Sequence, residues 1–182
     1  MSDQEPSLPV QSIPAGFGRR VVAWIIDSIV ILIGVYVVGI FLWPDLIETA
    51  RHASETDGAR LEVVSYSLSG LGSVVLGVVY WAYTALQESA SAQATLGKRM
   101  MGIRVTDLDG GRLSLLTASL RCWPLYLPGL VGMVVGLNAI VGIAAFVACL
   151  AVPFTRRKQG LHDMIARCLV VRRAPAVVYE AE

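Results

Sequence analysis

One acidic residue, Asp27, interrupts the apolar stretch VVAWIIDSIVILIG at residues 21–34. A charged side chain at the middle of a membrane helix costs roughly 2.5 to 3.5 kcal/mol on insertion scales, so such residues usually face a protein interior or a water-filled cavity. Burial also favours the protonated form of a carboxyl group, which lets an intramembrane carboxylate alternate between a proton and a cation. The sequence leaves two interpretations of Asp27 open: an ion or proton site, or a polar clamp that fixes the packing of helices.

Three other residues are candidates to act with Asp27. Arg20 lies seven residues earlier, on the same face of a helix and about 10 Å away along its axis. This distance excludes direct contact, but a water, a backbone carbonyl or a group from another helix could join the two. Asp163, in the stretch GLHDMIAR, is predicted either to cap a helix or form a salt bridge at the membrane face, or to act directly in transport. His162 beside it belongs to the residue type that titrates near physiological pH.

The composition is that of a membrane protein. Of the 182 residues, 55% are hydrophobic and 16% are charged, and the mean hydropathy is +0.62. The formal net charge of +1 gives no reason to expect nucleic-acid binding. The sequence contains no nucleophile elbow, phosphate loop or paired-carboxylate site, and its histidines and cysteines lack the spacing of a metal site. We therefore expect neither an enzyme nor a cofactor.

Two apolar stretches in the first half of the chain are long enough to cross a bilayer. Residues 21–43 form the first predicted transmembrane helix, because about 23 residues at 1.5 Å each span a hydrocarbon core of roughly 30 Å. Residues 67–86 form the second and contain no charged residue. Residues 45–62 between them contain five acidic residues and two arginines and are predicted to be a polar loop.

A third apolar stretch, residues 113–154, is long enough for two spans. It is predicted to form a helical hairpin bent near residues 136–138, and the alternative is a tilted interfacial helix at residues 114–127 followed by a re-entrant pair. Basic residues gather before the first span, in the second connection and after residue 155, which places both termini in the cytoplasm. An even number of crossings must then follow the second connection. About four membrane-embedded helices are therefore expected.

A stretch on the cytoplasmic side has the pattern of β-structure. Residues 103–106 alternate apolar and polar side chains, and DLDGG at residues 107–111 is a turn signal, so a β-hairpin is predicted here. The β-prone run at residues 168–171 could add a strand to it. The predicted fold is an all-α integral membrane protein with a small cytoplasmic β-hairpin plus a C-terminal strand. This membrane domain covers residues 15–173, between a disordered tail at residues 1–14 and a C-terminal tail at residues 174–182.

Three blocks together resemble the RDD family of bacterial membrane proteins: AGFGRRVVAWIID, TLGKRMMGIRVTDLDGGRLS and QGLHDMIARCLVV. They occur in the family's order and extend over most of the chain. The family is named for one arginine and two aspartates, which the resemblance assigns to Arg20, Asp27 and Asp163. Some members have been proposed to exchange sodium or other monovalent cations for protons, and a related domain occurs in proteins that assist membrane complexes.

Two functions follow from the residues and the resemblance. In the first, the chain exchanges Na⁺, K⁺ or Li⁺ for protons at Asp27, Arg20 tunes the charge of that site, and Asp163 organises its cytoplasmic mouth with His162. In the second, the chain is a non-transporting membrane adaptor or assembly factor, and Arg20, Asp27 and Asp163 form a structural lock. The lipid bilayer is the expected partner in both. A chain of this size could need a homo-oligomer to provide alternating access.

Overall fold

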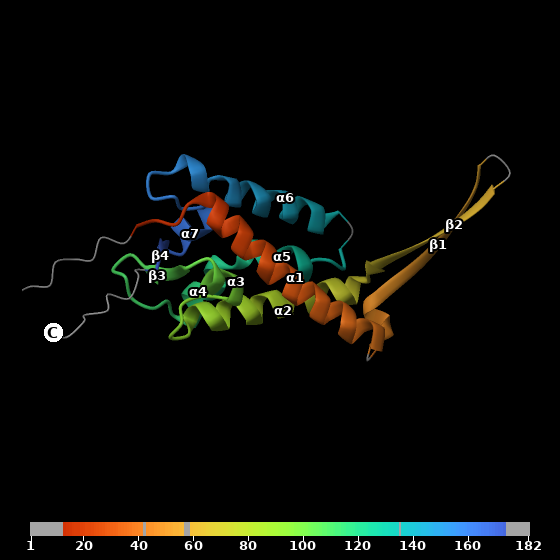
Figure 1. Cartoon of the computed structure of the whole chain (residues 1–182), viewed down its shortest axis with the longest axis horizontal. Helices are drawn as coiled ribbons and strands as arrows, with labels where there is room; N and C mark the ends of the chain where they lie inside the picture. Colours follow the sequence, from red (N-terminus) through yellow and green to blue (C-terminus); the bar gives the residue numbers. More distant parts are fainter. Residues whose placement is uncertain (1–12, 42, 57–58, 135, 174–182) are drawn as a thin grey trace, which may run out of the picture.

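The computed structural model describes residues 13–41, 43–56, 59–134 and 136–173. Three helical stretches are long and apolar enough to cross a membrane: α1 (Phe17–Phe41), α2 (Gly70–Ser89), and α6 (Leu137–Leu150) continued by the short helix η2 (Val152–Phe154). They run roughly along the long axis of the molecule (Figure 1). Both early predicted spans are therefore found as helices, and α2 ends three residues later than predicted, so that it includes Glu88.

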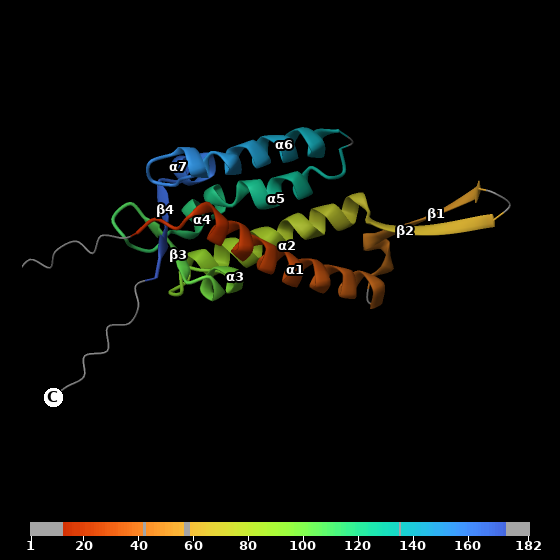
Figure 2. The same ribbon diagram turned by 45° about the horizontal axis from the view of Figure 1, so that its top comes forward.

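Two shorter helices, α4 (Leu115–Arg121) and α5 (Trp123–Leu130), precede α6. The chain breaks between them at Cys122, because Pro124 has no N–H to continue the hydrogen bonding of α4 but fits the first turn of a new helix. α5 packs between α2 and α6 (Figure 2). The approach to α2 requires glycine: a Cβ at Gly77 would lie 2.8 Å from the backbone oxygen of Tyr126.

The chain reverses direction between α5 and α6, where the sequence predicted a bend. Gly136 precedes α6 with a φ of 83°, a left-handed conformation that glycine adopts without a steric penalty. α5 and α6 then lie side by side as a helical hairpin (Figure 2).

A two-stranded antiparallel sheet lies at the end of the bundle where α1 begins (Figure 1). β3 (Ile103–Asp107) pairs with β4 (Cys168–Arg172), and the register places Val105 opposite Val170. The C-terminal strand is thus found, but the prediction of a hairpin at residue 103 was wrong: β3 has its partner at the far end of the sequence. The helices α3 (Leu96–Met100) and α7 (Leu161–Ile165) lie at the same end. Ile13 and Pro14, from the predicted N-terminal tail, lie beside β4.

The β-hairpin that the structure describes lies in the acidic connection between α1 and α2. After the short helix η1 (Pro44–Leu46), β1 (Ile47–Thr56) pairs with β2 (Ala59–Leu68), so the segment predicted to be a polar loop forms a β-hairpin instead. This hairpin projects from the end of the bundle opposite to β3 and β4 (Figure 1). Residues 13 and 173, where the described structure begins and ends, therefore lie with β3 and β4 at one end of the molecule, and the acidic connection is at the other.

Candidate functional site

Asp27 lies on α1 with 4% of its surface exposed and is held by three hydrogen bonds. Its Oδ1 accepts from the Tyr83 hydroxyl at 2.8 Å and from the Gly97 backbone N–H at 2.7 Å, and its Oδ2 accepts from the Thr95 hydroxyl at 2.6 Å. Among the residues that the structure describes, no basic side chain pairs with this carboxylate within 4.0 Å. Asp27 is therefore well hydrogen-bonded, and within the described part of the chain no fixed positive charge lies beside it.

Two of the three partners of Asp27 come from the start of α3, in the sequence TLGKR, and Tyr83 comes from α2. Thr95 caps α3 and donates to Asp27, while Gly97 lets α3 approach the backbone of α1. A Cβ at Gly97 would lie 2.2 Å from the carbonyl oxygen of Ala23, which is far inside van der Waals contact. The glycine is required for this contact, and the motif has a physical role in fastening α3 to α1.

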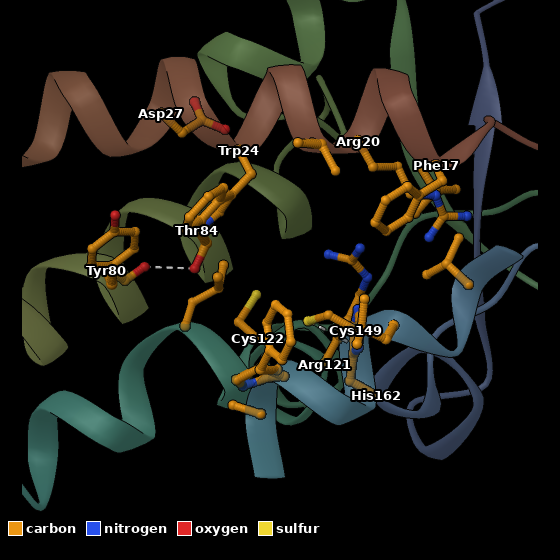
Figure 3. Close-up of a pocket in the computed structure, with 18 of the residues that line it drawn as sticks. Phe17, Arg20, Trp24, Asp27, Tyr80, Thr84, Arg121, Cys122, Cys149 and His162 are labelled. Carbon is orange, nitrogen blue, oxygen red and sulfur yellow. Dashed lines mark hydrogen bonds between the residues drawn. The ribbon is translucent and has the colours of Figure 1, made fainter. Parts of the chain in front are cut away.

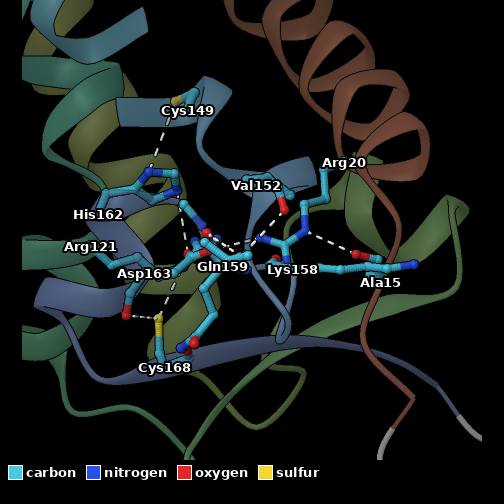
Figure 4. A network of polar contacts seen from close by, with 12 residues as sticks. Ala15, Arg20, Arg121, Cys149, Val152, Lys158, Gln159, His162, Asp163 and Cys168 are labelled. Atoms are coloured by element: carbon cyan, nitrogen blue, oxygen red, sulfur yellow. Dashed lines mark hydrogen bonds and ion pairs between the residues drawn. The ribbon is translucent and has the colours of Figure 1, made fainter. Parts of the chain in front are cut away.

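Arg20 does not contact Asp27. Its Nη1 donates to Asp163 Oδ2 at 2.6 Å, its Nη2 donates to the carbonyl oxygen of Lys158, and its Nε donates to that of Ala15 (Figure 4). The planar guanidinium thus joins the start of α1 to α7 and to the connection before it. The two residues on one helix face therefore belong to different polar sites, with no direct partner in common among those the structure describes.

Asp163 is fully buried and shares its carboxylate between two arginines. Besides Arg20, it accepts from Arg121 Nε at 2.9 Å and from the Gly160 backbone N–H at 3.1 Å. Burial alone raises the pKa of this carboxyl, but the charge of Arg121, together with His162 and Arg20, outweighs burial and holds the pKa well below its usual range. Asp163 is accordingly a charged connector between α1, α4 and α7.

The network continues into residues that the sequence analysis did not select. Nη1 of Arg121 donates to both oxygens of Glu88, at 2.7 and 2.6 Å, and Lys98 Nζ donates to Glu88 Oε1 at 2.6 Å. Glu88 is fully buried at the end of α2. Five charged side chains, which we call the lock, therefore form one chain of contacts through α1, α2, α3, α4 and α7: Arg20, Asp163, Arg121, Glu88 and Lys98.

His162 lies at the edge of the lock. Its Nε2 is 3.3 Å from Asp163 Oδ1 and its Nδ1 is 4.0 Å from Cys149 Sγ (Figure 4). Burial lowers the pKa of His162 to about 4, even though Asp163 acts in the opposite direction. The imidazole is therefore neutral at pH 7.

This lowered pKa predicts that the protein loses stability in mild acid. An unfolded histidine binds a proton near pH 6.5 and the folded one near pH 4. The contribution of His162 to the free energy of unfolding is therefore fully present above pH 6.5, and it falls by roughly 3 kcal/mol as the pH falls to about 4. The lowered pKa of Asp163 acts only at lower pH and does not contribute in this window. We expect melting temperatures in detergent to fall between pH 7 and 4.5, and to fall much less in His162→Gln. Parallel curves for the two proteins would contradict this assignment.

A cavity of about 610 Å³ lies between α1 and α6, above α5 (Figure 3). Asp27, Arg20, Arg121 and His162 are among the residues that line it, but most of its wall is apolar. Its polar residues lie at both ends, with Asp27 and Tyr80 toward one end and Arg20 and His162 toward the end near the sheet (Figure 3). All four residues selected from the sequence thus lie in or beside one cavity, although they form two separate hydrogen-bonded groups.

Comparisons with known proteins support the resemblance seen in the sequence. Residues 14–167 match the RDD family. The chain is 25% identical to the uncharacterized protein YxaI of Bacillus subtilis (strain 168), over 87% of this chain and 97% of the relative. It is 27% identical to the uncharacterized protein YckC of the same organism, over 89% of this chain and 87% of the relative. No solved structure matches the chain.

Proposed function

Because the chain belongs to the RDD family and is a membrane protein with three helices long and apolar enough to cross a bilayer, we propose that it exchanges a monovalent cation for a proton at Asp27. The observation that carries this proposal is a buried carboxylate without a basic partner among the described residues. Such a carboxylate requires a proton or a cation to compensate its charge. No enzymatic chemistry is part of this proposal.

The atoms around Asp27 suit a small cation. Besides the carboxylate, the hydroxyl oxygens of Tyr83 and Thr95 lie within hydrogen-bond distance, and both can offer lone pairs once their protons rotate away. Oxygen ligands of this kind are those that hard cations prefer. A proton on Asp27 would be exchanged for Na⁺, K⁺ or Li⁺ in this set of oxygens.

Arg20 and Asp163 have another role in this proposal. They belong to the lock, which holds the membrane helices to α7 and fixes the end of the cavity where His162 lies. Arg20 therefore acts on Asp27 through the position of α1 and not through a direct charge contact.

The proposed topology has four crossings, with α4 and α5 together as the third. α5 lies alongside α2 and α6, and the basic segments at the start of α1, around α3 and after α6 gather at the sheet end (Figures 1 and 2). By the positive-inside rule, both termini are then proposed to lie on the cytoplasmic side of a bacterial inner membrane. The bundle is small, and a homo-oligomer is proposed to provide the surfaces for alternating access.

Removal of the Asp27 charge tests the exchange. In proteoliposomes with an imposed Na⁺, K⁺ or Li⁺ gradient, wild type is expected to move protons and Asp27→Asn to reduce the initial rate at least tenfold, because the amide cannot take up or release a proton in this pH range. Asp109→Asn, on the exposed turn after β3, is the matched control and should keep the wild-type rate. An Asp27→Asn variant that is folded and exchanges at the wild-type rate would refute the proposal.

A second candidate function is a non-transporting adaptor or assembly factor. It is favoured by the lock, which is built as a structural connection, and by the hairpin of β1 and β2, which projects beyond the bundle and could pair with a partner (Figure 1). Folded wild type without any cation-driven proton flux, and with a protein that copurifies only when residues 47–68 are present, would favour this function.

A further inference from the structure

We propose that the cavity between α1 and α6 binds an anionic phospholipid, with the phosphate at its cationic end and an acyl chain along its apolar wall. This site does not depend on ion exchange at Asp27. It follows from how the charges of the lock are arranged around the cavity.

The basic members of the lock face the cavity and the acidic members lie behind them. Arg20, Lys98 and Arg121 all line it, whereas Glu88 and Asp163 are fully buried and do not. The three cations against two anions leave one positive charge, because burial keeps His162 neutral at pH 7. A phosphate diester, which carries one negative charge, would balance this excess.

Asp27 adds one negative charge to the lining of the cavity, but it lies apart from Arg20 and Arg121, further along α1 (Figure 3). Among the described residues that line the cavity, Asp27 alone is acidic, and its three hydrogen bonds come from α2 and α3. The surface available to a headgroup is therefore positive where Arg20, Lys98 and Arg121 meet.

The rest of the wall suits a hydrocarbon chain that enters from the bilayer. It is built mainly from apolar residues of α1, α5 and α6, among them Phe17, Val21, Trp24, Leu125 and Phe146. Trp24 and Phe146 are 50% and 64% exposed, so the cavity opens onto the apolar outer surface of the bundle. A volume of about 610 Å³ lies within the range of ligand cavities, roughly 300 to 1,000 Å³.

The position of the cavity matches the depth of a lipid headgroup. Arg20 and Arg121 lie toward the end of the bundle that carries the sheet and the basic connections, and Trp24 of the apolar wall lies further along α1 (Figure 3). A lipid in the adjoining leaflet could place its phosphate and its chain together without leaving the membrane. This distinguishes a phospholipid from a soluble anion, which would leave the apolar wall uncovered.

Native mass spectrometry of the detergent-solubilised full chain tests the proposal. Phosphatidylglycerol and phosphatidylcholine with identical oleoyl and palmitoyl chains are added in equal amounts. We expect phosphatidylglycerol to be retained at least tenfold more than phosphatidylcholine. Lys98→Gln should reduce this retention about tenfold, as expected for the loss of one charge-assisted contact of about 1.4 kcal/mol.

Two further variants separate lipid binding from stability. Gly142→Leu adds a side chain to the cavity at a position where a Cβ meets no atom within 4 Å, so it should block the lipid while it leaves the lock intact. Arg19→Gln removes an exposed charge of α1 outside the cavity and should retain phosphatidylglycerol as wild type does.

Three results would overturn the proposal. Equal retention of the two lipids would show that the cationic end does not select an anionic headgroup. Unchanged retention of phosphatidylglycerol in Gly142→Leu would place the lipid outside the cavity. Complete displacement of phosphatidylglycerol by equimolar palmitate would identify a free fatty acid as the ligand instead. Because retention is measured without an ion gradient, its outcome is independent of the proteoliposome flux.

Discussion

Replacement of Arg121 with methionine is expected to destabilise the protein by about 3 to 5 kcal/mol, which corresponds to a fall of about 6 to 20 °C in melting temperature. Arg121 is the one residue of the lock that contacts both of its carboxylates, Glu88 and Asp163. Without it, two buried negative charges each retain a single basic partner, Lys98 and Arg20 respectively. The measurement is thermal unfolding in detergent at pH 7.

Two comparisons identify the cause of that loss. Arg19→Met removes a positive charge from an exposed position of α1 and should change the melting temperature by no more than about 2 °C. Adding Glu88→Gln to Arg121→Met replaces a buried carboxylate that has lost one of its two basic partners with a neutral amide, and should recover part of the lost stability. An Arg121→Met protein with the melting temperature of wild type would show that the lock does not stabilise the fold.

Replacement of Gly97 with alanine is expected to have an effect of similar size for a steric reason. The new Cβ would lie 2.2 Å from the Ala23 carbonyl oxygen and 3.0 Å from Asp27 Cγ, and the first of these contacts is with backbone that cannot rotate away. α3 must then move from α1, which breaks the hydrogen bond from Gly97 to Asp27. We expect a loss of about 3 kcal/mol or more, and loss of the proposed exchange.

Gly34→Ala is the matched control for this substitution. Gly34 lies on the same helix as Asp27, and a Cβ there meets no atom within 4 Å, so alanine should be neutral or slightly stabilising. Wild-type stability in Gly97→Ala, measured beside this control, would mean that α3 does not pack against α1 as closely as the structure shows.

The residues that sequence analysis identified are those whose polarity contrasts with their surroundings. Asp27 is conspicuous in an apolar span, whereas Glu88, Lys98 and Arg121 lie near the ends of apolar segments, where charged residues are ordinary. Their importance depends on which residues meet after folding. The contact of Arg20 with Asp163 joins positions 143 residues apart, and no helical or strand periodicity connects positions so distant.

The strand pairing shows the same limit of local patterns. The alternation at residues 103–106 predicted β3 correctly, and the turn signal after it does form a turn. Asp107 Oδ1 accepts from the backbone N–H groups of Asp109 and Gly111, and Gly110 has a φ of 87°. The chain then continues to α4 instead of returning along β3, and the strand that pairs with β3 is β4. In contrast, β1 and β2 form in a segment whose polar composition suggested only a loop.

The central claim is that Asp27 is the ion site and that the five charged residues of the lock support the structure. The most direct test measures cation-driven proton flux and melting temperature in the same preparations of wild type, Asp27→Asn and Arg121→Met. We predict that Asp27→Asn reduces flux at least tenfold and changes the melting temperature by much less than Arg121→Met does. Wild-type flux in Asp27→Asn, or a melting temperature lowered as far as that of Arg121→Met, would contradict this division of roles.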